Sequence, residues 1–198
     1  MYDNSLYFSA LAHERSTILK TIDCGSKSFI LATVHRNTNT DIPERLIAIF
    51  EGLLAIAEQH ELAVIIPLHP RTKKYLQQTA NQLFLEQLTT SPFIHIIDPV
   101  GFLDMIRLEQ DAVLVVTDSG GVQKEAYFFK KPCIVLREET EWVELVETGA
   151  AKLVGADKSQ LIDAANDFLA NPPTVFPTIF GDGKAAVFIC QSLVDELN

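Results

Sequence analysis

Short, continuous apolar runs alternate along the chain with longer segments in which apolar residues recur at helical spacing. Such runs are typical of strands buried on both faces of a parallel sheet. They predict strands at Ser28–Thr33, Ala63–Leu68, Phe93–Ile97, Val113–Val116, Cys133–Leu136 and Lys152–Val154. Helical spacing predicts helices over about the first 20 residues, from Asp41 to about His60, and at Thr72–Leu88, Phe102–Glu109, Glu141–Glu147, Ser159–Ala170 and Ala185–Leu197, with one more beginning at Val122.

This alternation predicts an α/β fold built on a doubly wound parallel sheet of about six strands with right-handed crossovers. The 198 residues, 47% of them hydrophobic, fit one domain that spans residues 1–198. A leading helix is expected within residues 1–22 and a C-terminal helix within 184–198. The leading helix has no strand before it, which suggests that a preceding part of the fold is absent.

Charge and cysteine content restrict the classes of function. A net charge of −10 argues against a nucleic-acid or anionic-membrane surface. Cys24, Cys133 and Cys190 are odd in number and far apart, which favours buried thiols in a reducing cytosol. No apolar run approaches a membrane span, and the N-terminus lacks the pattern of a signal peptide. A cytoplasmic protein is therefore expected.

The residues after Val113–Val116 suggest a binding site. Thr117-Asp118-Ser119-Gly120-Gly121 separates this strand from the next helix. A strand, a glycine turn and a helix present free backbone N–H groups and the positive end of a helix dipole, which favour a phosphate. An ordinary turn in which Asp118 or Ser119 caps the helix is the alternative.

Other polar residues lie where neighbouring strands end. His35-Arg36 follow the first strand and His69-Pro70-Arg71 the second. Doubly wound sheets bind ligands beyond the carboxyl ends of their strands, here at the switch point between the first and fourth strands. Neighbouring strands are about 4.8 Å apart, so these groups could meet one ligand, although His69 could equally cap a strand end. Glu125 is either a solvated helix residue or a ribose acceptor.

Metal and ATP chemistry lack their usual patterns. No His/Cys/Asp/Glu cluster has metal-ligand spacing, so no bound metal is expected. A Walker lysine motif is also absent, which argues against ATP hydrolysis.

Four motifs in this order resemble those of non-hydrolysing UDP-N-acetylglucosamine 2-epimerases. They are Thr33-Val34-His35-Arg36, Leu68-His69-Pro70, Thr117-Asp118-Ser119-Gly120-Gly121-Val122-Gln123-Lys124-Glu125-Ala126 and Phe180-Gly181-Asp182-Gly183-Lys184-Ala185. The resemblance covers essentially the whole chain but only the C-terminal half of such an enzyme. It implies one of two Rossmann-like domains in a glycosyltransferase-B-like arrangement, with the active site between them and possible homodimerisation.

The resemblance also implies roles for individual residues. His35 would be catalytic, beside the glycosidic oxygen and the phosphate. The implied UDP-sugar contacts are Ser119, Gly120 and Gly121 on the diphosphate, Glu125 on the ribose, the Pro99–Met105 segment with Val100 and Met105 over the uracil, and Arg36, His69 and Trp142 in the cleft. No cofactor is implied. In the family the C2 proton is removed and UDP leaves and re-adds, which needs a carboxylate base that the missing N-terminal domain would supply.

Two departures from the family pattern put the sugar in doubt. Thr38 stands where the family often has Glu, and Thr140-Glu141-Trp142-Val143-Glu144 replaces Thr-Glu-Arg-Pro-Glu. The Trp142 variant resembles relatives that epimerise UDP-2,3-diacetamido-glucuronic acid. The alternatives are the nucleotide-sugar domain of a glycosyltransferase or of a hydrolysing 2-epimerase, and a UDP-binding module without catalysis.

Overall fold

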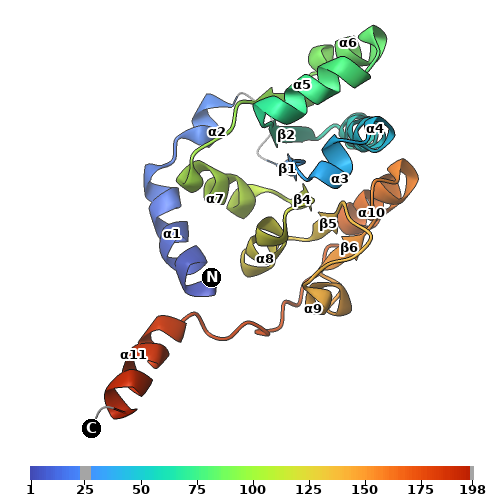
Figure 1. Ribbon diagram of the computed structural model, residues 1–198. Coiled ribbons are helices and arrows are strands. Elements are labelled where there is room, and N and C mark those ends of the chain that lie inside the picture. Colours follow the sequence, from blue (N-terminus) through green and yellow to red (C-terminus); the bar gives the residue numbers. More distant parts are fainter. Residues whose placement is uncertain (23–27, 197–198) are drawn as a thin grey trace.

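The computed structural model describes residues 1–22 and 28–196, in which six parallel strands form one sheet in the order β3-β2-β1-β4-β5-β6 (Figure 1). The strands are β1 (Phe29–Thr33), β2 (Ala63–Pro67), β3 (Ile94–Ile97), β4 (Leu114–Thr117), β5 (Cys133–Val135) and β6 (Ala151–Leu153). The helices are α1 (Tyr2–Arg15), α2 (Ile18–Thr21), α3 (Asn37–Thr40), α4 (Pro43–His60), α5 (Pro70–Thr79), α6 (Gln82–Thr90), α7 (Phe102–Asp111), α8 (Gly120–Phe128), α9 (Val143–Glu147), α10 (Lys158–Ala170) and α11 (Ala185–Glu196).

The strand order confirms the predicted doubly wound sheet and its switch point between β1 and β4. These strands pair in register up to Thr33 and Thr117, whose hydroxyl oxygens lie 2.6 Å apart. Because both strands end together, the segments that follow them leave the sheet side by side.

Helices cover both faces of the sheet (Figure 1). On one face, alternate strand residues such as Ile30 and Val116 pack against α4, α5, α6 and α10. On the other face, Leu31 and Val115 pack against α2, α7, α8 and α9. Strands buried on both faces explain why the sequence shows continuous apolar runs rather than alternation.

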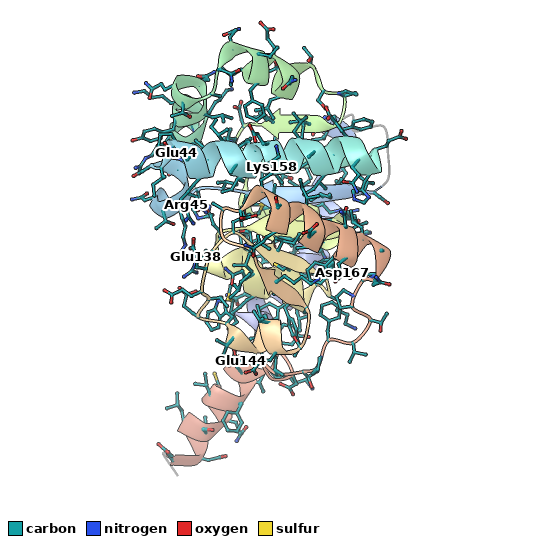
Figure 2. All side chains as sticks on the ribbon, turned by 90° about the vertical axis from the view of Figure 1, so that its right-hand side faces the viewer. Glu44, Arg45, Glu138, Glu144, Lys158 and Asp167 are labelled. Carbon is teal, nitrogen blue, oxygen red and sulfur yellow. The ribbon has the colours of Figure 1, made fainter. Side chains whose placement is uncertain are left out.

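Polar contacts join α4 to the loop after β5 and to α10 at the surface of the first face (Figure 2). Arg45 of α4 contacts Glu138 at 2.7 Å, and Lys158 at the start of α10 contacts Glu51 of α4 at 3.0 Å. Exposed ion pairs of this kind contribute about 0–1 kcal/mol each, so the apolar layer beneath them holds the helices together.

Several predicted boundaries were wrong for local reasons. The leading helix breaks after Arg15, where Ser16 accepts the Ile18 N–H. The segment Thr72–Leu88 contains two helices, since Asn81 caps a new one by accepting the Phe84 N–H. The stretch after β1 contains the short helix α3, and the later helices begin at Pro43, Gly120 and Val143 rather than at Asp41, Val122 and Glu141.

The cysteine prediction was only partly right. Cys133 is buried in β5, whereas Cys190 is exposed on α11, and Cys24 lies outside the described residues. Within residues 1–22 and 28–196, no helix is long and apolar enough to cross a membrane.

Candidate functional site

Asp118 organises the carboxyl edge at the switch point. Its side chain is completely buried and accepts the backbone N–H groups of His35 at 3.1 Å and of Arg36 at 2.9 Å. The Asn39 amide donates to the same carboxylate at 3.1 Å. Hydrogen bonds from several donors repay the cost of burying a charge, so the carboxylate fixes the loop after β1 against β4.

The Asp118 carboxylate also orients the imidazole of His35. The Nδ1 atom of His35 lies 3.3 Å from Asp118 Oδ1, while 52% of the His35 side chain remains exposed. An imidazole held by one nitrogen has its other nitrogen, Nε2, free to act on a ligand. This geometry suits a general acid or a hydrogen-bond donor at the edge of the sheet.

Asn39 is a supporting residue that sequence reasoning missed. It is fully buried, donates to the Leu136 carbonyl at 2.9 Å, and accepts a hydrogen bond from Arg45 at 3.1 Å. A chain of polar contacts thus runs from Arg45 on α4 through Asn39 to Asp118. A single Asn in a short polar loop is not part of any periodic pattern, so the sequence does not single it out. The one hint is that an Asn side chain can both donate and accept hydrogen bonds.

The glycine turn has two free amides. Ser119, not Asp118, caps α8, although its hydroxyl lies 3.5 Å from the Val122 nitrogen. The Ser119 amide donates to Thr117 Oγ1 at 2.9 Å. The amides of Gly120 and Gly121 have no partner among the residues that the structure describes. These two amides are therefore the donors that remain for an anion. The turn can cap α8 through Ser119 and bind an anion through the amides at the same time.

Trp142 and two arginines flank the turn on the β5 side. The indole N–H of Trp142 donates to the Gly120 carbonyl at 2.9 Å. Glu141 lies close by but is held by two hydrogen bonds from Arg137, which lower the pKa of its carboxyl to about 2. Arg36 Nε donates to the Asp118 carbonyl at 2.9 Å, and its terminal nitrogen lies 3.9 Å from Glu141. The guanidinium groups of Arg36 and Arg137 therefore lie beside the turn together with the carboxylates of Glu141 and Asp118.

The remaining predicted residues lie farther from the turn. Glu125 is half-buried on α8, and burial raises the pKa of its carboxyl. His69 is exposed and caps α5, where its Nδ1 accepts the Arg71 N–H at 3.2 Å. Val100 and Met105 lie at the start of α7 and pack partly into the apolar layer. Thus hydrogen bonds join His35, Arg36, the turn and Trp142, while among the described residues no side-chain hydrogen bond links Glu125, His69, Val100 or Met105 to this group.

The described residues contain no group of three or more His, Cys, Asp or Glu side chains that could hold a metal ion. The polar groups that the structure brings together at the site are backbone amides, the guanidinium groups of Arg36 and Arg137, and the imidazole of His35.

Comparison with known proteins places the chain in a family. Residues 1–194 match the family model described as UDP-N-acetylglucosamine 2-epimerase. The chain belongs to this epimerase family. A UDP-N-acetylglucosamine 2-epimerase homolog of Methanococcus maripaludis is 42% identical over 195 residues, which cover 98% of this chain and 52% of the relative.

Two further similarities bear on substrate and fold. The UDP-2,3-diacetamido-2,3-dideoxy-D-glucuronate 2-epimerase of Pseudomonas aeruginosa is also 42% identical, over 98% of this chain and 50% of the relative. The structure of UDP-GlcNAc 2-epimerase from Methanocaldococcus jannaschii in complex with UDP-GlcNAc and UDP superimposes with a TM-score of 0.85 at 39% identity, over 98% of this chain and 52% of that one.

The chain spans about half the length of these epimerases. Its sheet corresponds to one half of their glycosyltransferase-B-like structures, as the sequence predicted. A UDP-forming trehalose-phosphate synthase from Burkholderia xenovorans, 15% identical, shares the fold alone with a TM-score of 0.64. Fold similarity by itself thus does not separate epimerases from glycosyltransferases.

Proposed function

We propose that this chain is the UDP-binding C-terminal domain of a non-hydrolysing UDP-sugar 2-epimerase. The observation that carries the proposal is the pair of free Gly120 and Gly121 amides beside His35 and Arg36 at the switch point. In this proposal the amides and Arg36 hold the diphosphate, and Glu125 accepts hydrogen bonds from the ribose. Val100 and Met105 cover the uracil, while His69 and Trp142 line the cleft.

His35 has the chemical role in this proposal. When the C2 proton is removed, its electron pair forms the C1=C2 double bond, and the C1–O bond breaks with its electrons on the diphosphate. His35 Nε2 donates to the leaving oxygen while Asp118 holds Nδ1. The product of this step is a 2-acetamidoglucal with UDP; re-addition of the UDP oxygen at C1, with a proton delivered to C2 from the opposite face, gives the epimer. A donor aimed at the oxygen that gains charge acts mainly in the transition state.

The base for C2 must come from another domain in this proposal. Asp118 is buried and fully hydrogen-bonded, Glu141 is held by Arg137, and Glu125 is assigned to the ribose. Among the described residues, none of these three carboxylates is therefore left to take the proton. The epimerases that this chain matches are about twice as long, which supports a second domain as the source.

The exposed apolar surface of α11 also supports the presence of a second domain. This helix extends from the body of the molecule in Figure 1, and none of its described residues is buried. Val187, Phe188 and Leu193 are 69%, 73% and 57% exposed. Exposed apolar surface of this kind marks an interface. In this proposal a second domain covers α11, and a second copy of the chain is the competing occupant.

The sugar belongs to one of two branches. Of two relatives that are 42% identical, one is named a UDP-N-acetylglucosamine 2-epimerase homolog and the other a UDP-2,3-diacetamido-2,3-dideoxy-D-glucuronate 2-epimerase. Trp142 at the position where many members have arginine favours the uronate branch. The alternatives are a hydrolysing 2-epimerase, which would release UDP and free N-acetylmannosamine, a glycosyltransferase donor domain, and a binding module without chemistry.

The first prediction is that the 198-residue chain binds UDP but does not turn over a UDP-sugar. Incubation with UDP-N-acetylglucosamine in D₂O, followed by NMR, should show no exchange at C2 above the enzyme-free control. Joining the chain to the half of the M. maripaludis relative that it does not match should restore exchange. Exchange by the chain alone would contradict the need for a second domain, and no UDP binding would contradict the proposed site.

A further inference from the structure

The indole of Trp142 holds one peptide unit of the glycine turn. Its N–H donates to the Gly120 carbonyl at 2.9 Å, and that carbonyl belongs to the same planar peptide unit as the Gly121 N–H. The Gly121 amide has no partner among the described residues. Because the unit is planar and rigid, a donor on its carbonyl fixes the direction of its N–H. The same hydrogen bond polarises the unit, which makes the N–H a stronger donor.

The start of α8 needs such a restraint from outside the helix. Gly120 and Gly121 are its first two residues. Glycine is among the weakest helix formers, because its backbone loses the most freedom when it is ordered. The turn with the two free amides is therefore the part of α8 with the least intrinsic order. A hydrogen bond from a neighbouring loop supplies order that the glycines themselves do not.

Hydrogen bonds also brace Trp142 against α8. The Gln123 side chain is fully buried on that helix, and its Oε1 accepts the Thr140 hydroxyl at 2.6 Å. Thr140 Oγ1 in turn accepts the backbone N–H of Trp142 at 3.1 Å. A threonine hydroxyl can donate and accept at the same time, so this one group joins the two residues. The chain of hydrogen bonds thus starts and ends on α8, at Gln123 and at Gly120.

The ring of Trp142 is held by a cation from the same helix. Lys124 Nζ lies over the indole at 4.0 Å from the ring centroid and over the Phe180 ring at 4.3 Å. Both distances are within the range of cation–π attraction. The rings of Trp142 and Phe180 also meet edge to face, with centroids 6.3 Å apart. The backbone, the ring and the polar atom of Trp142 are therefore all engaged next to the turn.

We propose that Trp142 is a positioning residue that, through the Gly120 carbonyl, aims the Gly121 N–H at the diphosphate, while Thr140 and Gln123 fix Trp142 in place. The proposal rests on the proposed function, in which the two glycine amides hold the diphosphate. It gives Trp142 a role toward the phosphates in addition to lining the cleft. A residue that acted only on the transferred sugar would leave the binding of UDP, which lacks that sugar, unchanged.

The second prediction concerns Trp142→Phe in the 198-residue chain, measured by calorimetry. Phenylalanine keeps a ring for Lys124 and Phe180 but lacks the N–H. UDP affinity should fall by about three- to tenfold, the scale of one neutral hydrogen bond. Affinity for uridine, which has no phosphate, should change by less than about twofold. Phe176→Leu is the control, because Phe176 contacts Tyr127 in the same aromatic cluster, and it should bind UDP as the wild type does.

Two variants of Thr140 test the brace. Thr140→Val removes the hydroxyl that joins Gln123 to Trp142, so UDP affinity should fall about as much as in Trp142→Phe. Thr140→Ser keeps the hydroxyl and should bind UDP within about twofold of the wild type. Thermal melts check that each variant is folded. Folded Thr140→Val with wild-type UDP affinity would overturn the brace, and equal losses of UDP and uridine affinity in Trp142→Phe would overturn the role toward the phosphates.

The indole N–H gives a readout that a merely structural role would not move. Trp142 is the one tryptophan in the sequence, so the indole gives a single NMR signal that is assigned at once. Coupling between two equilibria is reciprocal. UDP should therefore slow the hydrogen exchange of this N–H by about the same three- to tenfold, and uridine should leave the exchange rate unchanged. An indole exchange rate that UDP does not slow would contradict the proposal.

The inference and the proposed function fail in different ways. Wild-type chain that does not bind UDP would contradict the proposed site, as would saturable binding that leaves the Gly120 and Gly121 amide signals unshifted. Wild-type binding that shifts both amide signals, together with unchanged UDP affinity in folded Trp142→Phe, would overturn the role of Trp142 alone.

Discussion

Replacing His35 with alanine in a two-domain protein that carries this chain is expected to lower kcat by about 10² or more, the usual scale for losing an acid or an oxyanion donor. KM should change far less, because the Gly120 and Gly121 amides still hold the ground-state diphosphate. Steady-state kinetics of epimerisation measure both quantities.

The structure indicates that this loss is not a stability effect. The Asp118 carboxylate accepts the backbone N–H of residue 35, which alanine retains, and the imidazole is half exposed. Asn81→Ala is the matched control, since it removes the cap of α6 at a residue outside the proposed site. That variant should lose about 0.5–2 kcal/mol of stability with kcat nearly unchanged. A His35→Ala enzyme with kcat within about threefold of wild type, a barrier change of ~0.65 kcal/mol, would leave His35 without a catalytic role.

Replacing Gly121 with valine is expected to abolish UDP binding to a chain that still folds. A Cβ atom at this position would meet only Ser119 Oγ at 3.7 Å and Met1 Cε at 3.8 Å, which are ordinary contacts. Crowding of the turn itself is thus smaller than the sequence suggested, and the clash is with the phosphate. Gly121→Ala should already weaken UDP by about ten- to a hundredfold, the scale of one or two charge-assisted hydrogen bonds.

Binding of uridine distinguishes the phosphate contact from the other contacts of the site. It lacks the diphosphate, so its affinity should be nearly the same in the wild type and in Gly121→Ala. A thermal melt checks that each variant is folded. Unchanged UDP affinity in folded Gly121→Val would contradict the phosphate assignment.

The strands could be predicted from the sequence because burial on both faces leaves a continuous apolar signal. Their alternation with helices also predicted the switch point between the first and fourth strands. The predicted strand limits differ from the observed ones by at most one residue at either end. Helix limits were less accurate where a single polar cap decides them. Asn81 and Ser16 end or begin helices inside stretches whose apolar spacing continues across the break.

The sequence predicted which residues lie at the site better than it predicted what each of them contacts. The turn and His35 stood out because polar groups after buried strands are unusual. Whether Asp118 or Ser119 caps α8 depends on side-chain direction, and the structure gives that role to Ser119 while Asp118 binds the loop after β1. Asn39 gave no signal, since its burial arises from contacts with segments far apart in the sequence.

The central claim is that UDP binds at the glycine turn between β4 and α8, and amide NMR of the 198-residue chain tests it most directly. Titration with UDP should shift the Gly120 and Gly121 amide signals most strongly, with smaller shifts at His35 and Arg36. The Gly52 amide in α4, which packs against α10 on the opposite face, serves as the internal reference and should not move. Saturable shifts at the two glycines are the result that the proposed site predicts. Saturable UDP binding that leaves both glycine amides unshifted would contradict it.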